Sequence, residues 1–249
     1  MDFELEICCN SLNSALAAQK GDASRIELCD NMAEGGTTPS MGLIQVCKNL
    51  LTIPVFPIIR PRGGDFLYND AEFEVMKQDI TICKKIGCEG VAIGLLKANG
   101  SIDTNRCREI IELARPMQVT FHRAFDRCKD LQISLESIIL LGFERVLTSG
   151  AEVSAANAIV NLSNLVKWAA GRIIIMAGSG INESNIADIA HKTGIQAFHS
   201  TAKTARETKM TCLASGKLAE LDGLFPILET STEKVRSMKN ALAGLSTRN

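Results

Sequence analysis

The sequence predicts a TIM-like (β/α)₈ barrel of the α/β class, and two observations lead to this prediction. Short β-branched runs alternate with amphipathic helical segments about eight times along the chain, which implies right-handed βαβ units and a parallel sheet. The length of 249 residues also suits one such barrel, since these barrels commonly contain roughly 250 residues. We therefore expect residues 1–249 to form a single domain.

Each strand is expected where a β-branched run precedes a polar or glycine-rich loop. In chain order the strands are Glu4–Cys8, Arg25–Cys29, Val55–Arg60, Gly90–Gly94, Val119–His122, Arg145–Thr148, Ile173–Met176 and Ala197–His199. The helices between them include Leu12–Gln19, Asp70–Ile86, Asn105–Ala114, Leu131–Leu141, Ala155–Ala169 and Glu183–Lys192. An open doubly wound sheet is the alternative fold. Such a sheet usually has a glycine-rich turn after its first strand, whereas Asn10 and Ser11 follow the first strand here.

Residues 203–230 interrupt the alternation of strands and helices. Gly216 and residues 223–226 prevent a long helix, and a last helix is expected near Thr232–Ala243. We expect an irregular lobe that serves as a surface connection, a lid or an interface. Its apolar side chains predict a homo-oligomer, because such groups tend to be buried at interfaces. These side chains are Leu213, Leu218, Leu221, Leu224 and Phe225.

Composition limits the expected partners and location. The formal net charge is −1, with no block of like charge, so we expect neither nucleic acid nor a membrane as a partner. The N-terminus is acidic where a secretory signal is basic, and no apolar run reaches the roughly 18 residues of a membrane span. A cytoplasmic protein is therefore expected. The nine cysteines form no C-x-x-C pair, which argues against a disulfide framework and a zinc ribbon.

Side-chain alternation predicts which polar residues face the barrel axis. In the first strand Leu5 and Ile7 suit the helix interface, which leaves alternate polar residues facing inward. The same argument applied to the second and fifth strands gives the full inward set. It contains Glu4, Glu6, Cys8, Arg25, Glu27, Cys29, Thr120 and His122.

Charged side chains inside a barrel need a partner or a function, because burying an isolated ion is costly. A salt bridge between Glu4 or Glu6 and Arg25 would fill the interior and is one expectation. Residues nearer the strand ends lie where the βα loops converge, which is where barrel enzymes place their chemistry. The expected catalytic residues are accordingly Glu6, Glu27, Arg60 and His122.

Several segments, read in order, resemble the CutC copper-homeostasis family. They are E-I-C at 6–8, R-I-E-L-C at 25–29, E-G-G-T-T-P-S at 34–40, I-R-P-R-G-G-D-F at 59–66, T-F-H-R-A-F-D at 120–126, R-V-L-T-S-G at 145–150 and M-A-G-S-G-I at 176–181. The resemblance extends to about residue 206 and implies a TIM-like barrel, a cytoplasmic location and a link to copper tolerance. The sequence departs from the family pattern at 199–202, where H-S-T-A stands for H-x-S-A.

Two functions follow from these residues, and the first is copper binding. Soft thiolates select Cu(I), and two sulfurs on converging vectors suffice for a site. Cys8 and Cys29 share inward parity on neighbouring strands about 4.8 Å apart, so their sulfurs meet if the strand register aligns them. The alternative is that both are buried thiols without a metal. Copper(I) is therefore the expected cofactor, with Cys8 and Cys29 as its ligands.

The second function is catalysis on a small anionic or phosphorylated molecule. Arg60 and Arg62 offer bidentate donors to such a group, while Glu27 and His122 suit proton transfer. Barrels often bind phosphate through the loops after their last two strands and a helix N-terminus. Residues 178–180 occupy that position, before a helix that Asn182 would cap. The expected ligand-binding residues are Arg62, Asp65, Arg123, Gly178, Ser179, Gly180 and Ser200.

Overall fold

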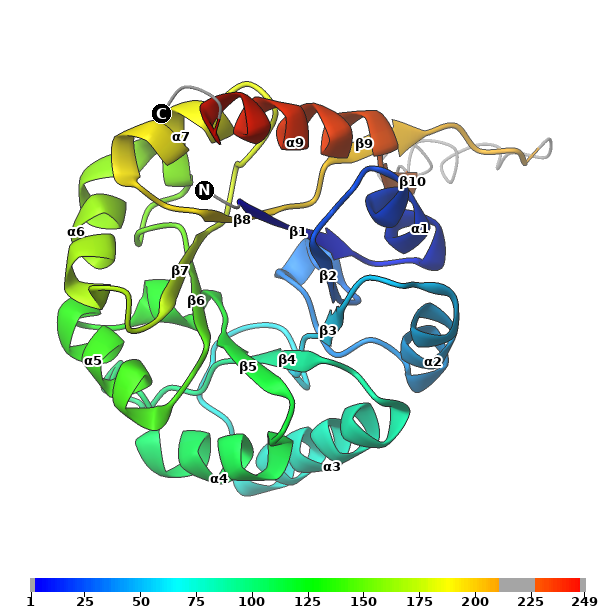
Figure 1. Ribbon diagram of the computed structural model, residues 1–249. Helices are drawn as coiled ribbons and strands as arrows, with labels where there is room; N and C mark the ends of the chain where they lie inside the picture. The colour runs from blue at the N-terminus through cyan, green and yellow to red at the C-terminus, as the bar shows by residue number, and fades with distance from the viewer. Residues whose placement is uncertain (1–2, 211–226, 247–249) are drawn as a thin grey trace, which may run out of the picture.

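Eight parallel strands form a barrel that a ring of helices surrounds (Figure 1). This computed structural model describes residues 3–210 and 227–246. Neighbouring strands follow the order β3-β2-β1-β8-β7-β6-β5-β4. Beyond the end of β3, Ile58 bridges Ala92 of β4, and the Ile59 N–H donates to the Ala92 carbonyl over 2.8 Å. These contacts join the two edge strands, and the predicted TIM-like barrel is confirmed.

The observed elements follow the predicted alternation of strands and helices. The barrel strands are β1 (Glu4–Cys9), β2 (Arg25–Leu28), β3 (Val55–Pro57), β4 (Gly90–Ile93), β5 (Gln118–Phe121), β6 (Arg145–Thr148), β7 (Ile174–Ala177) and β8 (Ala197–Ser200). The helices are α1 (Leu12–Lys20), α2 (Met41–Leu50), α3 (Asp70–Ile86), α4 (Thr104–Ala114), α5 (Leu131–Leu141), α6 (Ile159–Ala169), α7 (Ile186–Thr193) and α9 (Thr232–Ser246). Strand β3 is shorter than expected, which leaves Arg60 in the loop that follows it.

Two helices begin later than the sequence predicts. Residues Ala155–Asn157 form a separate 3₁₀ turn, η3, and α6 begins only at Ile159. Helix α7 begins at Ile186, because the Asn182 side chain accepts hydrogen bonds from the backbone and hydroxyl of Ser184 and so holds a turn before the helix. The expectation that Asn182 caps this helix is therefore wrong.

The segment 203–230, where the sequence predicts an irregular lobe, has a β-strand at each end. Strands β9 (Lys203–Arg206) and β10 (Ile227–Thr230) pair antiparallel. The Thr230 N–H donates to Ser14 Oγ over 3.1 Å, which holds β10 against α1. The apolar residues on which the expected homo-oligomer depends, at 213, 218, 221, 224 and 225, lie outside the described residues.

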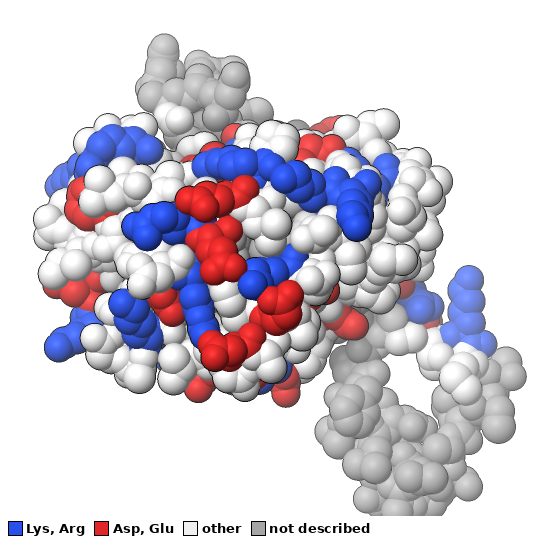
Figure 2. Space-filling model, turned by 90° about the horizontal axis from the view of Figure 1, so that it is seen from below, with Lys and Arg blue, Asp and Glu red and all other residues white. Residues whose placement is uncertain are grey.

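The main apolar core lies between the strands and the helices. Leu5, Ile7, Ile26 and Leu28 point outward and are fully buried there. On the face shown in Figure 2, basic and acidic side chains are interspersed, in keeping with a net charge of −1. Within the two described stretches, every helix is too short or too polar to cross a bilayer.

Candidate functional site

The lower part of the barrel interior contains charged side chains joined in ion pairs. Glu6 and Arg25 are register partners on β1 and β2, and Arg25 Nε lies 2.6 Å from Glu6 Oε2, although its N–H is not aligned with that oxygen. Arg145 on β6 reaches Glu4 at 3.2 Å. The expected salt bridge is thus formed by Glu6 with Arg25, while Glu4 pairs with Arg145.

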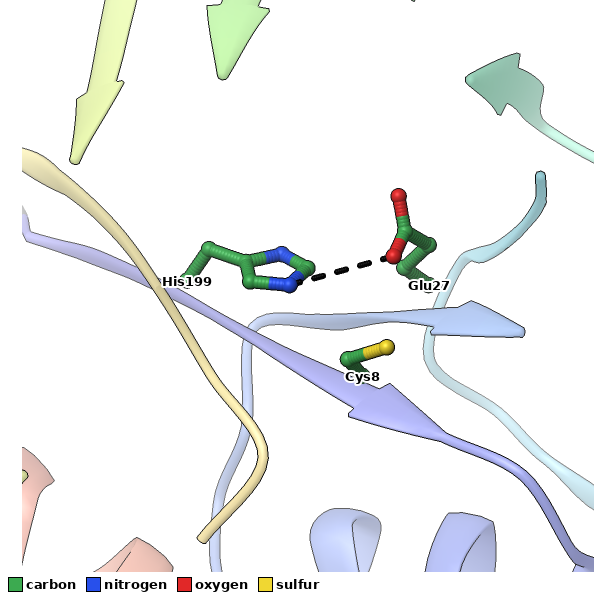
Figure 3. A group of neighbouring side chains, drawn as sticks. All are labelled: Cys8, Glu27 and His199. Atoms are coloured by element: carbon green, nitrogen blue, oxygen red, sulfur yellow. Dashed lines mark ion pairs between the residues drawn. The ribbon is translucent and has the colours of Figure 1, made fainter. Parts of the chain in front are cut away.

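Above this layer, two thiols, a carboxylate and an imidazole converge near the C-terminal strand ends. Cys8 Sγ lies 3.3 Å from Cys29 Sγ. His199 Nε2, from β8, lies 3.8 Å from Glu27 Oε2 (Figure 3). Ligand atoms of Cys8, Glu27 and His199 all lie within 4.8 Å of one another. Thiolate, imidazole and carboxylate are common metal ligands, so this group could hold a metal ion.

Glu6 fixes the orientation of the His199 ring. Its Oε1 lies 2.7 Å from His199 Nδ1, while its other oxygen faces Arg25. Burial raises the Glu6 pKa, but Arg25 and His199 outweigh burial and lower it to about 2. An ionised Glu6 accepts a hydrogen bond from the His199 Nδ1–H group. His199 Nε2 then faces Cys8 and Glu27. A carboxylate behind a histidine is the usual support of a metal-binding imidazole.

The protonation of this group favours metal uptake at higher pH. Hydrogen bonding to Cys29, together with burial, raises the pKa of Cys8 well above its ordinary value. Burial lowers the His199 pKa, but Glu27 and Glu6 outweigh burial and raise it. Burial also raises the Glu27 pKa. A metal must therefore displace protons from this group, which makes its binding dependent on pH.

A cavity of about 810 Å³ opens above the group. Its wall includes most of the residues that the sequence singled out. They are Cys8, Glu27, Cys29, Arg60, His122, Arg123, Ser179, Gly180 and Ser200. Glu6 does not line the cavity and lies behind His199, which does. Such a volume is typical of small-molecule sites and exceeds the space that one metal ion needs.

Arg60 joins two loops at the rim of the cavity. Its Nη1 donates to the carbonyls of Glu34 at 2.7 Å and Gly36 at 2.8 Å, and its Nη2 donates to the Gly64 carbonyl at 2.8 Å. Its guanidinium lies 5.0 Å from the centre of the Phe66 ring. The residue is 4 % exposed, yet its Nε has no hydrogen-bond partner in the described part of the chain.

His122 lies against the same Phe66 ring, with 5.1 Å between ring centres. Its Nδ1 accepts a hydrogen bond from the backbone N–H of Ala124 at 3.1 Å, so the ring proton of neutral His122 is on Nε2, from which no described residue accepts a hydrogen bond. Burial and the nearby Arg60 charge lower its pKa to about 3. Gly94 makes room for the ring, since a Cβ there would lie 2.4 Å from His122 Cε1.

Asp126 is a buried carboxylate that the sequence argument did not select. Its oxygens accept hydrogen bonds from the Thr148 hydroxyl at 2.5 Å, the Ser149 hydroxyl at 3.0 Å and the Arg123 guanidinium at 2.8 Å. His199 was also missed as a site residue. Phe198 packs outward in the core, so the parity argument applied to the eighth strand would have placed His199 inward.

Three expected ligand-binding residues lie off the cavity wall. Arg62 Nε donates to Glu72 Oε1 at 2.5 Å, and its Nη2 reaches Asp65 at 3.0 Å, so both Arg62 and Asp65 are held in surface ion pairs toward α3. Gly178 packs beneath the wall, where a Cβ would lie 2.5 Å from a Leu147 methyl group.

The fold and the site define a TIM-like barrel with a thiol, imidazole and carboxylate group beneath a polar cavity. The CutC family model matches residues 3–204. A copper homeostasis protein cutC homolog of Mus musculus is 45 % identical over 246 residues, covering 97 % of this chain and 89 % of the mouse protein. A family protein CutC of Vibrio vulnificus is 45 % identical over 252 residues, covering 99 % and 100 %. The chain therefore belongs to the CutC family.

A solved structure agrees with this assignment. The crystal structure of a copper homeostasis protein CutC from Streptococcus agalactiae matches with a TM-score of 0.77 and 35 % sequence identity. The match covers 80 % of this chain and 98 % of that one. Both the barrel and the family are thus shared with a protein of known structure.

Proposed function

We propose that the protein binds Cu(I) through Cys8 and Cys29 and serves copper homeostasis. The observation that carries this proposal is the 3.3 Å separation of the two sulfurs at the open end of the barrel. Soft thiolates select Cu(I) over harder ions, and two of them suffice for a site. The relatives that are called copper homeostasis proteins support the same function.

The geometry favours a third ligand beside the two thiolates. Linear S–Cu–S coordination needs sulfurs roughly 4.3–4.8 Å apart, twice a bond somewhat over 2 Å. The sulfurs are closer than this, at 3.3 Å, so a linear site requires them to move apart. A third ligand bends the S–Cu–S angle and brings the sulfurs together. His199 Nε2 is the best-placed donor, because Glu6 fixes its ring from behind.

Copper uptake through these residues must release protons. Both thiols have to ionise, and the raised pKa of Cys8 makes this harder as the pH falls. The raised pKa of His199 adds a third proton that competes with the metal. Copper affinity should therefore drop steeply between neutral and mildly acidic pH.

The proposal also includes the domain organisation, the location and the oligomeric state that the sequence predicts. The chain acts as a single barrel domain, in the cytoplasm, as a homo-oligomer. A cytoplasmic location suits Cu(I) binding, because thiols stay reduced in that compartment. Sedimentation at micromolar concentration tests the oligomer, and a monomer would contradict it.

Anaerobic titration of the reduced protein with Cu(I), in competition with a chromophoric Cu(I) chelator, tests the site. Cys8→Ser and Cys29→Ser should each weaken copper binding by more than about 100-fold. Loss of a residue that merely hydrogen-bonds to a metal ligand already lowers metal affinity about 10–100-fold. Cys83→Ser and Cys107→Ser are matched controls, because both thiols are buried on helices α3 and α4. Full affinity in Cys8→Ser, or loss in Cys107→Ser, would contradict the proposal.

A further inference from the structure

The cavity wall contains a buried cation, Arg60. The Arg60 guanidinium donates to three backbone carbonyls and lies beside the Tyr68 hydroxyl, and within the part of the chain that the structure describes it forms no ion pair. Three carboxylates on the cavity wall, Glu27, Glu34 and Asp126, have other partners, and Glu34 accepts a hydrogen bond from Asn31 at 2.9 Å. Asp126 accepts from Thr148, Ser149 and Arg123, and Glu27 faces His199. A buried charge left in this state is costly unless a ligand supplies the opposite charge.

Two buried nitrogens beside this charge are hydrogen-bond donors without an acceptor. Arg60 Nε and His122 Nε2 have no partner among the described residues, and the two residues are 4 % and 3 % exposed. Both side chains lie against the Phe66 ring, at 5.0 Å for Arg60 and 5.1 Å for His122, and both line the cavity. Because Nδ1 of His122 accepts from Ala124, neutral His122 can only donate at Nε2. The complementary ligand therefore presents acceptor atoms.

A third set of donors lies elsewhere on the wall. Among the described residues, the backbone N–H groups of Ser179, Gly180 and Ile181 have no hydrogen-bond acceptor, and these residues also line the cavity. Ser179 and Gly180 both have positive φ, 74° and 72°. Successive free N–H groups of this kind form anion-binding concavities, and in barrels this loop often holds a phosphate.

We propose that the cavity binds a small organic molecule with a phosphate or carboxylate group, whose oxygens accept hydrogen bonds from Arg60 Nε and His122 Nε2. The volume of about 810 Å³ fits a molecule of metabolite size. This ligand is distinct from copper, since neither Arg60 nor His122 belongs to the group of Cys8, Cys29, Glu27 and His199. The inference therefore stands whether or not copper binds.

The test is ¹⁵N-histidine NMR on the metal-free, reduced protein. The chain has three histidines, so the spectrum is simple, and the exposed His191 is an internal control. The probes are 2-phosphoglycolate, succinate and inorganic phosphate. At least one of the two organic anions should shift the Nε2 signal of His122 in a saturable way, leave His191 unchanged and bind more tightly than inorganic phosphate. Tighter binding of 2-phosphoglycolate than of succinate identifies phosphate as the preferred group, and the reverse order identifies carboxylate.

Substitutions of Arg60 and His122 test whether these two side chains bind the anion. By calorimetry, Arg60→Lys and His122→Phe should each weaken the preferred organic anion about tenfold or more, as expected for a lost hydrogen bond to a charged group. Arg172→Gln is the matched control, because this arginine pairs with Glu136 on the outer surface. If both variants fail to fold, the NMR titration of the wild-type protein decides. Three results overturn the proposal: no saturable His122 shift, inorganic phosphate binding as tightly as both organic anions, or unchanged affinity in folded Arg60→Lys and His122→Phe.

Discussion

Two layers of the barrel interior use similar residues in different ways. In the lower layer Glu6 pairs with Arg25 and Glu4 with Arg145, so each charge has an opposite charge beside it. In the upper layer the Arg60 guanidinium donates to backbone carbonyls, and no residue that the structure describes accepts from Arg60 Nε or His122 Nε2. In the lower layer the charges are balanced within the protein, although Arg25 Nε and Nη1 have no aligned acceptor among the described residues. In the upper layer the Arg60 charge has no opposite charge beside it among the described residues, and the proposed anion would supply one.

The largest expected decrease in stability comes from replacing Arg25 in the lower layer. Arg25→Met leaves Glu6 buried without its arginine and also removes the guanidinium that lies 4.2 Å from the Phe56 ring centre. Loss of one partner of a buried pair costs about 3–5 kcal/mol. Urea unfolding should show this decrease in the free energy of unfolding. A decrease below about 1 kcal/mol would mean that the lower layer does not stabilise the fold.

His122 should make the protein less stable in acid. Its pKa is lowered to about 3 in the fold, from an ordinary value of 6.5. Below about pH 6.5 the unfolded chain binds a proton that the folded chain does not, so the free energy of unfolding falls as the pH drops toward 3. The slope contributed by this group approaches about 1.4 kcal/mol per pH unit. His122→Phe should flatten the slope between about pH 6 and pH 4 in urea unfolding, and an unchanged slope would contradict the buried neutral imidazole.

Arg145→Met should have a smaller effect than Arg25→Met. Its partner Glu4 has a side chain that is 40 % exposed, so water can solvate that carboxylate once the arginine is gone. Partly exposed pairs contribute about 1 kcal/mol or less. Urea unfolding of Arg25→Met and Arg145→Met under the same conditions checks this order. Equal decreases in the free energy of unfolding would show that burial does not set the strength of the two ion pairs.

The smallest effect on stability should come from the upper layer. Cys8→Ser removes a proposed copper ligand but keeps nearly the same volume, so the free energy of unfolding of the metal-free protein should change by about 1 kcal/mol or less. Copper affinity should nevertheless be lost. A large loss of stability would place Cys8 in the structural layer instead.

The sequence predicted the barrel and much of the cavity wall, because strand periodicity is a local property. Parity alone placed Glu6, Cys8, Glu27 and Cys29 on the inward side. The sequence grouped Glu6 with Glu27, Arg60 and His122 near the strand ends, but Glu6 lies in the lower layer, because its depth depends on its register with Arg25 and His199 from other strands.

Other features depended on contacts that sequence spacing does not encode. Arg62 and Asp65 were expected at the ligand, but a capping box at the start of α3 places Glu72 where it attracts Arg62. Helix α7 starts late because of the turn that Asn182 holds. These outcomes were decided by side-chain hydrogen bonds within loops, where periodicity gives no signal.

X-ray absorption at the copper edge of the Cu(I)-loaded protein tests the central claim most directly. With Cys8 and Cys29 as ligands, the metal should have two sulfur neighbours at about 2.2–2.3 Å, together with a nitrogen if His199 completes the site. The sulfur shell should disappear in the Cys8→Ser Cys29→Ser double variant and persist in Cys83→Ser. A copper shell of nitrogen and oxygen alone in the wild-type protein, or sulfur neighbours that survive the double substitution, would contradict the account.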